Sequence, residues 1–141
     1  CFLAPPVGKQ STLPQGERVL SSKDAKAMRH MTYLLTQPAG TAKQAAINGY
    51  SVGGKTGTVH KQVGGSYAQN QYSGFFVGFA PVDSPRVIAA VMIDDPKNGV
   101  YYGGAVAGPV FSAAVQQALQ ILQVQPDLPL TIATKPVGGQ P

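Results

Sequence analysis

The sequence has 141 residues, which is enough for one domain or for part of a larger one. Its net charge of +5 comes from Lys and Arg residues that are scattered along the chain, so we expect no nucleic-acid partner. The single cysteine, Cys1, excludes an intrachain disulfide, and no apolar run is long enough to cross a membrane. A start at Cys1, without an initiator methionine or a signal peptide, is what we expect of a piece of a longer protein or of a processed N-terminus.

The first part of the chain predicts a loop and then a helix. Residues 1–20 are rich in proline, glycine and polar side chains, which indicates a loop or extended segment. The Ser-x-x-Asp spacing at 21–24 is that of a capping box, so a helix should follow and should end before Pro38, at about residue 36. A short helical turn is expected over 41–47. The predicted apolar face of the first helix consists of Met28, Met31 and Leu35.

Three strand candidates follow, at about residues 50–62, 72–80 and 86–93. Turn signals separate them at 64–66, where two glycines precede a serine, and at 81–85, which begins and ends with proline. Connections this short join antiparallel strands, because parallel strands need a long crossover. The sequence therefore predicts an antiparallel sheet.

A second helix is expected from Pro109, because proline is favoured at a first helical position. Its apolar stripe should pack against the sheet, which would make 21–124 the folded part of the chain. The prolines and glycines beyond it predict a flexible tail over 125–141. Asp95 precedes Pro96 and is expected to be extended. The predicted stripe consists of Phe111, Val115, Ala118, Leu119 and Leu122.

The most informative stretch is Lys55-Thr56-Gly57-Thr58, within the first strand candidate. In an extended segment Lys55 and Gly57 point to one face and the two threonines to the other, unless a bulge changes their direction. A cation and two hydroxyls on one strand can bind a carboxylate, since the ammonium supplies charge and the hydroxyls supply direction. The pattern therefore predicts an anion-binding strand.

The same residues also match a phosphate-binding loop. Residues 49–56 fit the pattern G-x-x-x-x-G-K-[ST], and a hydrophobic run later ends in Asp94-Asp95, as in proteins that hold magnesium. Such a loop needs a buried strand before it and a helix at its Lys-Thr. Residues 41–48 are instead helix-prone, and Gly57 follows directly after the Lys-Thr. A nucleotide-binding module is thus a second alternative, disfavoured by its context.

The order of several blocks resembles a known family. The Gly-Gly-Lys-Thr-Gly-Thr run at 53–58 resembles the K-T-G box of penicillin-binding proteins and serine β-lactamases. Residues 75–81 and 85–96 resemble the next two strands of that fold, and 101–111 resembles the join into its last helix. The resemblance covers about 15–125. It is greatest to the class B, division-type peptidoglycan D,D-transpeptidases, the group of FtsI or penicillin-binding protein 3.

This resemblance implies the C-terminal portion of the transpeptidase fold, an α/β domain of the α+β type with an antiparallel sheet flanked by helices. It implies acyl transfer from D-Ala-D-Ala stem peptides at the division septum, through a serine acyl-enzyme that β-lactams trap. The expected partners are stem peptides, β-lactams, the N-terminal remainder of the same enzyme and division proteins such as an FtsW-type glycosyltransferase. The expected location is the periplasmic face of the bacterial inner membrane. No cofactor and no metal are expected.

The resemblance also assigns roles along the K-T-G strand. Lys55 would orient the substrate carboxylate and tune the proton network around the nucleophile. Thr56 and Thr58 would hydrogen-bond the carboxylate and the donor backbone. Gly57 would let the substrate lie along the strand as an added extended segment, with the backbone near Thr58 contributing to an oxyanion hole.

Further along the chain, the resemblance places aromatic walls around the pocket. Tyr72, Tyr101 and Tyr102 align with these walls, with core packing as the alternative for Tyr72. His60 would add a pH-dependent contact at the end of the groove, or would be a solvated strand histidine. Gly103 is expected to serve tight backbone geometry where the sheet meets the helix.

The family's serine motifs are missing from this sequence. No serine has a lysine three residues later or an asparagine two residues later, so neither S-x-x-K nor S-x-N occurs. In the family both motifs precede the K-T-G box, so the chain is expected to lack the nucleophile and to be inactive alone. A degenerate pseudoenzyme is the less favoured explanation, because the K-T-G side is intact. A related serine D,D-carboxypeptidase or β-lactamase-like hydrolase is the first alternative function.

Overall fold

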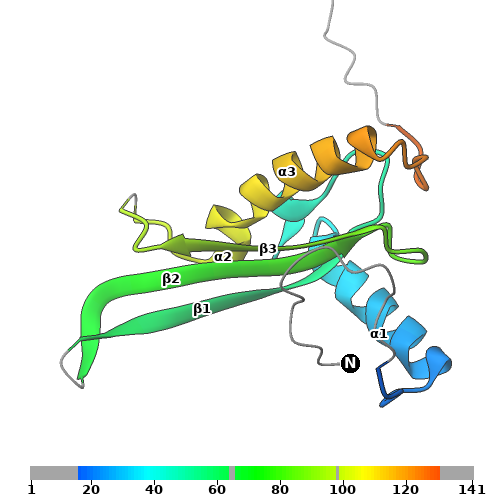
Figure 1. Ribbon diagram of the computed structural model, residues 1–141. Helices are drawn as coiled ribbons and strands as arrows, with labels where there is room; N and C mark the ends of the chain where they lie inside the picture. The colour runs from blue at the N-terminus through cyan, green and yellow to red at the C-terminus, as the bar shows by residue number, and fades with distance from the viewer. Residues whose placement is uncertain (1–15, 64–65, 98, 131–141) are drawn as a thin grey trace, which may run out of the picture.

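The computed structural model describes residues 16–130, except 64, 65 and 98. Its centre is a three-stranded antiparallel sheet in the order β1-β2-β3, with helix α3 on one side and helix α1 on the other (Figure 1). This arrangement confirms the predicted antiparallel sheet flanked by helices. The elements are α1 (Ser22–Tyr33), the 3₁₀ helices η1 (Leu34–Thr36) and η2 (Lys43–Ala45), β1 (Gly53–Val63), β2 (Ser66–Ala80), β3 (Val87–Asp94), α2 (Gly103–Val106) and α3 (Gly108–Ile121).

Helix α1 begins at the predicted capping residue. Ser21 Oγ accepts a hydrogen bond from the Asp24 backbone N–H at 3.0 Å, which satisfies one of the free donors at the helix start. The predicted apolar face is only partly right, because Met28 and Met31 are 54% and 56% exposed. Among the described residues, nothing buries these two side chains.

The register of the sheet is regular through the K-T-G motif. Strand β1 pairs with β2 from Gly53 opposite Phe79 to His60 opposite Tyr72, and the pairing shifts only after His60. Strand β3 pairs with β2 from residue 73 to residue 80. Because β2 begins at Ser66, earlier than predicted, the β1–β2 ribbon extends past the end of β3 (Figure 1). Most of the turn predicted at 64–66 lies outside the described residues.

The core lies between the sheet and α3. Phe76 of β2 and Phe111 of α3 are fully buried and meet edge to face, with ring centroids 4.8 Å apart. Val115 and Leu119 complete the predicted helical stripe inside this core. The prediction is wrong for Leu122, which is 50% exposed and follows the last residue of the helix, Ile121.

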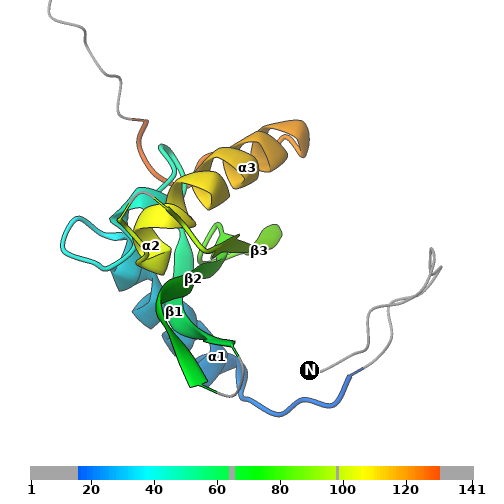
Figure 2. The same ribbon diagram turned by 90° about the vertical axis from the view of Figure 1, so that its left-hand side faces the viewer.

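The opposite face of the sheet carries apolar side chains in contact with solvent. We call it the open face. Helix α3 lies on the other side of the sheet (Figure 2), and α1 covers only the end of the open face near the start of β1 (Figure 1). Strand β3 alternates between half-buried and exposed positions, so its two faces differ as in a sheet covered on one side. The exposed apolar side chains of this face are Val59 (50%), Val77 (49%), Ile88 (75%) and Met92 (59%).

One prediction for the segment that follows β3 requires correction. Asp95 has a φ of 50°, so it is left-handed rather than extended. Aspartate tolerates this region better than most residues, and the Asp95 N–H donates to the Tyr72 carbonyl at 2.8 Å. In the first part of the segment predicted as a flexible tail, the Leu128 N–H donates to the Gly49 carbonyl at 3.1 Å. Residues 131–141 lie outside the described residues.

Candidate active site

The K-T-G motif lies on an edge strand. Among the described residues no strand pairs with the outer edge of β1, so its backbone groups there are available to an extended ligand. Lys55 is exposed, and its Nζ donates to the Thr56 carbonyl at 2.9 Å. The ammonium group therefore lies along the strand and within reach of an anion on the outer edge.

The side chains of the motif alternate as predicted. Thr56 lies opposite buried Phe76 and shares the α3 side of the sheet, whereas Lys55 lies opposite Val77 on the open face. The pairing is regular through these positions, so no bulge changes their direction. The motif thus presents its ammonium on one side of the edge and its hydroxyls on the other.

Thr58 connects β1 to the helix that follows the sheet. Its Oγ1 accepts a hydrogen bond from the Gly103 backbone N–H at 3.1 Å. A hydroxyl can accept and donate at once, so the proton of Thr58 remains available to a ligand acceptor. This contact fixes the orientation of the hydroxyl and leaves its donor function.

Gly57 has room for a side chain, unlike the nearby glycines Gly54 and Gly103. A Cβ at Gly57 would lie 3.7 Å from the nearest atom, in the Phe75 side chain, which is ordinary contact. A Cβ at Gly54 would lie 2.4 Å from the Phe76 ring, and one at Gly103 would lie 2.4 Å from the Gly57 carbonyl oxygen. Packing therefore requires glycine at 54 and 103, while nothing in the described part of the chain requires it at 57.

Four aromatic rings form a column beside the threonines. Tyr72 stacks on Tyr101 with ring centroids 4.0 Å apart and planes 11° from parallel. His60 lies against Tyr72 at 4.4 Å, and Tyr102 lies against Tyr101 at 4.6 Å. The structure thus brings together the four residues with aromatic rings that the resemblance assigned to the walls of the pocket and the end of the groove. Tyr72 stacks within this column rather than in the core around Phe76.

The neighbouring hydroxyls of Tyr101 and Tyr102 affect the pKa of Tyr101. The Tyr101 hydroxyl donates to the Tyr102 hydroxyl at 3.4 Å. This hydrogen bond, together with repulsion from a Tyr102 phenolate, raises the pKa of Tyr101 above 10.0. Tyr101 is thus a neutral hydrogen-bonding group at neutral pH.

A polar cluster that the sequence did not predict crosses the sheet at the far end of the open face. Lys61 of β1 pairs with Asp94 of β3 at 2.8 Å, and Ser73 between them donates to Asp94 at 2.6 Å. The Lys61 and Ser73 hydrogen bonds lower the pKa of Asp94, and the bond to Asp94 raises the pKa of Lys61. Only the sheet register identifies these residues as neighbours.

The strand geometry excludes the phosphate-binding loop. Lys55 and Thr56 lie inside an antiparallel strand, whereas that loop places its Lys-Thr at the start of a helix after a parallel strand. Asp94 contacts Lys61 and Ser73 instead of lining a phosphate site. In the described part of the chain no three His, Cys, Asp or Glu side chains gather as metal ligands do.

An antiparallel sheet backed by a C-terminal helix, with Lys-Thr-Gly-Thr on its edge strand, defines the penicillin-recognising class of proteins to which the sequence blocks pointed. A family model described as "Penicillin binding protein transpeptidase domain" matches residues 3–116. The chain belongs to this family.

Individual relatives agree with this assignment. The chain is 46% identical over 123 residues to a protein of Neisseria flavescens named "Probable peptidoglycan D,D-transpeptidase PenA", covering 87% of this chain and 31% of that protein. It is 41% identical over 114 residues to Escherichia coli "Peptidoglycan D,D-transpeptidase FtsI", covering 79% of this chain and 19% of that protein. The chain thus spans less than a third of the length of these relatives.

A solved structure supports the fold. The transpeptidase domain of Burkholderia pseudomallei penicillin-binding protein 3, determined without ligand, superposes with a TM-score of 0.77 at 44% identity. The match covers 86% of this chain and 37% of that domain's chain. The described residues therefore have the fold of one portion of a transpeptidase domain.

Proposed function

We propose that this chain supplies the K-T-G side of the active site of a division-type peptidoglycan D,D-transpeptidase. The observation that carries the proposal is the outer edge of β1, where Thr58 has a hydroxyl proton to donate and Gly57 has no packing reason to be glycine. The names of the relatives from Neisseria flavescens and Escherichia coli support the same activity.

The proposed substrate is the D-Ala-D-Ala end of a stem peptide, bound as an extended strand. Its carboxylate would receive hydrogen bonds from the threonine hydroxyls and charge from Lys55, a charge-assisted arrangement that is stronger than neutral hydrogen bonds. Its backbone would pair with the outer edge of β1, and the absence of a side chain at Gly57 permits that close approach. The aromatic column from His60 to Tyr102 would form one wall of the pocket.

The nucleophile would come from the N-terminal remainder of the enzyme. A serine oxygen would attack the penultimate D-Ala carbonyl, the bond to the terminal D-Ala nitrogen would break, and an acceptor amine would later take the acyl group. A β-lactam carbonyl would acylate the same serine, with ring opening in place of a departing amino acid. The exposed apolar residues of the open face support a partner of this kind, because they would be buried by further parts of the domain.

The location and protein partners follow from the same proposal. Cross-linking of the wall would take place at the periplasmic face of the inner membrane, beside a division-complex glycosyltransferase of the FtsW type. No helix in the described ranges has the length and apolar character needed to span a bilayer. In this proposal the membrane anchor lies in the N-terminal remainder of the enzyme.

Fluorescent-penicillin labelling of the complete protein tests the proposal. We expect one labelled band that survives denaturation, since the label is an ester, and that is lost when unlabelled penicillin is added first. Lys55→Ala should lower the labelling rate by roughly a hundredfold, which corresponds to loss of one well-placed charged contact. Lys23→Ala, an exposed lysine on α1, is the matched control and should label normally.

Two results would contradict the proposal. Absence of label on the folded complete protein would exclude a penicillin-recognising active site. Rapid loss of label, with release of hydrolysed penicillin in seconds, would instead identify the β-lactamase-like hydrolase. A transpeptidase should keep its label for much longer than one catalytic cycle.

A further inference from the structure

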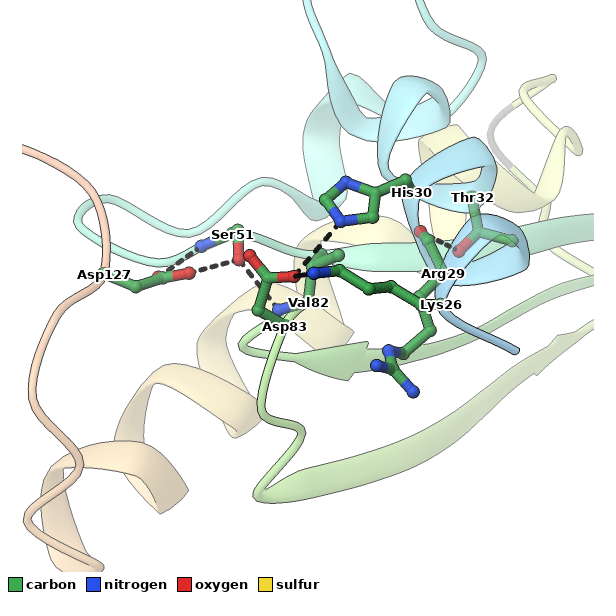
Figure 3. Close-up of polar contacts among 8 residues, drawn as sticks. All are labelled: Lys26, Arg29, His30, Thr32, Ser51, Val82, Asp83 and Asp127. Atoms are coloured by element: carbon green, nitrogen blue, oxygen red, sulfur yellow. Dashed lines mark hydrogen bonds and ion pairs between the residues drawn. The ribbon is translucent and has the colours of Figure 1, made fainter. Parts of the chain in front are cut away.

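The residue that leads into β1 is held by the segment that follows α3. Ser51 is 7% exposed, and its backbone N–H donates to Asp127 Oδ1 at 2.8 Å. The Ser51 hydroxyl donates to the other carboxylate oxygen of Asp127 (Figure 3). Both oxygens of one carboxylate thus bind the backbone and the side chain of one residue, which fixes Ser51 in position and direction.

The Ser51 hydroxyl also holds the turn between β2 and β3. The Val82 backbone N–H is buried and donates to Ser51 Oγ at 2.8 Å (Figure 3). One hydroxyl therefore joins three segments: the entry to β1, the β2–β3 turn and the segment after α3. We call the hydrogen bonds among Ser51, Val82 and Asp127 the clasp. Losing the hydroxyl would leave a buried donor unsatisfied.

Neighbouring contacts keep the same segments together. The Tyr50 hydroxyl donates to the Val124 carbonyl at 2.7 Å, and the Leu128 N–H donates to the Gly49 carbonyl at 3.1 Å. On the far side of the turn, Asp83 lies 3.1 Å from His30 of α1. The β2–β3 turn is therefore attached both to the clasp and to α1.

The position of the clasp matters because β1 is an edge strand. Its inner edge is fixed by β2, but in the described structure its outer edge has no strand beside it. The strand begins at Gly53, directly after the clasp, and Lys55 follows. A shift of the backbone at the start of β1 would therefore move the K-T-G motif along β2 or away from it.

We propose that Asp127 is a positioning residue for the active site and acts through Ser51 to hold β1 in place. This inference rests on the proposed function, since it concerns how quickly the site is acylated. Asp127 touches no substrate. Its carboxylate sets the path of the chain into the K-T-G motif, and a misplacement of about 1 Å at a reacting site can cost about a hundredfold in rate.

The test uses the complete protein, with this chain joined to its N-terminal remainder. The variants are Asp127→Ala, Asp127→Asn and Ser51→Ala, together with Val115→Ala as a control that removes buried apolar volume on α3 away from the clasp. The measurements are the second-order acylation rate constant for a β-lactam, the Tm, and hydrogen–deuterium exchange of residues 51–58. Rates are measured well below every Tm.

We expect Asp127→Ala to lower the acylation rate constant by roughly tenfold or more and to speed exchange at 51–58. Asp127→Asn should lower the acylation rate constant by less, because the amide oxygen of asparagine can still accept a hydrogen bond from the Ser51 N–H. Combining Ser51→Ala with Asp127→Ala should cost little beyond either change alone, because both break the same clasp. Val115→Ala should lower the Tm while it leaves the acylation rate near that of the unaltered protein.

A wild-type acylation rate in folded Asp127→Ala would overturn the inference. So would a loss no larger than that of a control variant with the same Tm. If Asp127→Ala does not fold, Asp127→Asn decides the question, and unchanged rate and exchange in that variant count against the inference. Absence of acylation in the unaltered protein would contradict the proposed function instead, because hydrogen exchange still reports the clasp without any reaction.

Discussion

The backbone N–H of Gly103 donates to the hydroxyl of Thr58 across 3.1 Å, so the start of α2 is bonded to a side chain of the K-T-G motif. The two residues come from segments far apart in the sequence. Their contact leaves one hydrogen atom of Thr58 for a ligand and sets its direction. Under the proposed function, the start of α2 would assist substrate recognition through Thr58 without touching the substrate.

Substitutions at Thr58 distinguish the effect of its hydroxyl from the effect of its side-chain volume. Thr58→Val keeps the volume and removes the donor, so the acylation rate constant for a β-lactam should fall about tenfold or more. Thr58→Ser keeps the hydroxyl and should retain most of the rate. Stopped-flow acylation of the complete protein measures both variants, and equal rates for the two would show that the hydroxyl has no part in recognition.

Two glycines on β1 should respond differently to alanine. Gly57→Ala adds a Cβ at ordinary contact distance from Phe75, so the Tm should change little while acylation falls sharply. Gly54→Ala drives a Cβ to 2.4 Å from the Phe76 ring and should cost about 1–3 kcal/mol of stability through overpacking. Thermal unfolding together with acylation rates compares them. A large loss of stability in Gly57→Ala would contradict the assignment of this glycine to the substrate.

The aromatic column should affect acylation most strongly for β-lactams with large side chains. Tyr101→Ala removes the ring that stacks on Tyr72 at 4.0 Å, a contact of about 0.5–1.5 kcal/mol. We expect acylation by β-lactams with bulky side chains to weaken more than acylation by small ones. Tyr101→Phe keeps the stack and is the matched control. If both variants discriminate among β-lactams as the unaltered protein does, the column is not a pocket wall.

The pairing of Lys61 with Asp94 predicts a pH dependence of stability. Because the folded pKa of Asp94 lies below 3.8, its contribution is present above that pH and is lost as the pH falls through the lowered pKa. Lys61 has a raised pKa, so its contribution is present below 10.5 and is lost as the pH rises through the higher folded value. Both groups are exposed, so added salt should weaken the effect.

The matched variant for this pH dependence is Asp94→Asn. Urea unfolding at a series of pH values below 4 should show a smaller fall in the free energy of unfolding than in the unaltered protein, since one pH-dependent contribution is gone. Asp24→Asn, on the first turn of α1, removes a carboxylate that is not paired with Lys61. An acid dependence in Asp94→Asn identical to that of the unaltered protein would show that the pair does not stabilise the fold.

The sequence predicted the elements whose signals are local. Strand alternation placed Lys55 and Thr56 on opposite faces, and the helical spacing of Phe111, Val115 and Leu119 identified the packed side of α3. Both patterns depend on backbone periods that hold wherever a regular element forms. The short turns between the strand candidates extended these local predictions to antiparallel pairing.

The errors arose where neighbours distant in sequence decide the outcome. Met28 is exposed among the described residues although its helical face is apolar, and Asp95 adopts a positive φ where Pro96 favours an extended shape. Ser51 and Asp127 are 76 positions apart, and no spacing rule relates them. The sequence of a short, proline-rich segment such as 125–130 does not reveal which part of the chain it contacts.

The open face has a practical consequence for engineering. A chain with an exposed apolar sheet face is suited to split-protein complementation, because burial of Val77, Ile88 and Met92 would favour association of two separately made parts of a domain. Under the proposed function, mixing this chain with the serine-bearing part of the domain should restore penicillin labelling that neither part has alone. The sheet that carries the K-T-G motif would then form the interface of a two-part reporter for β-lactams.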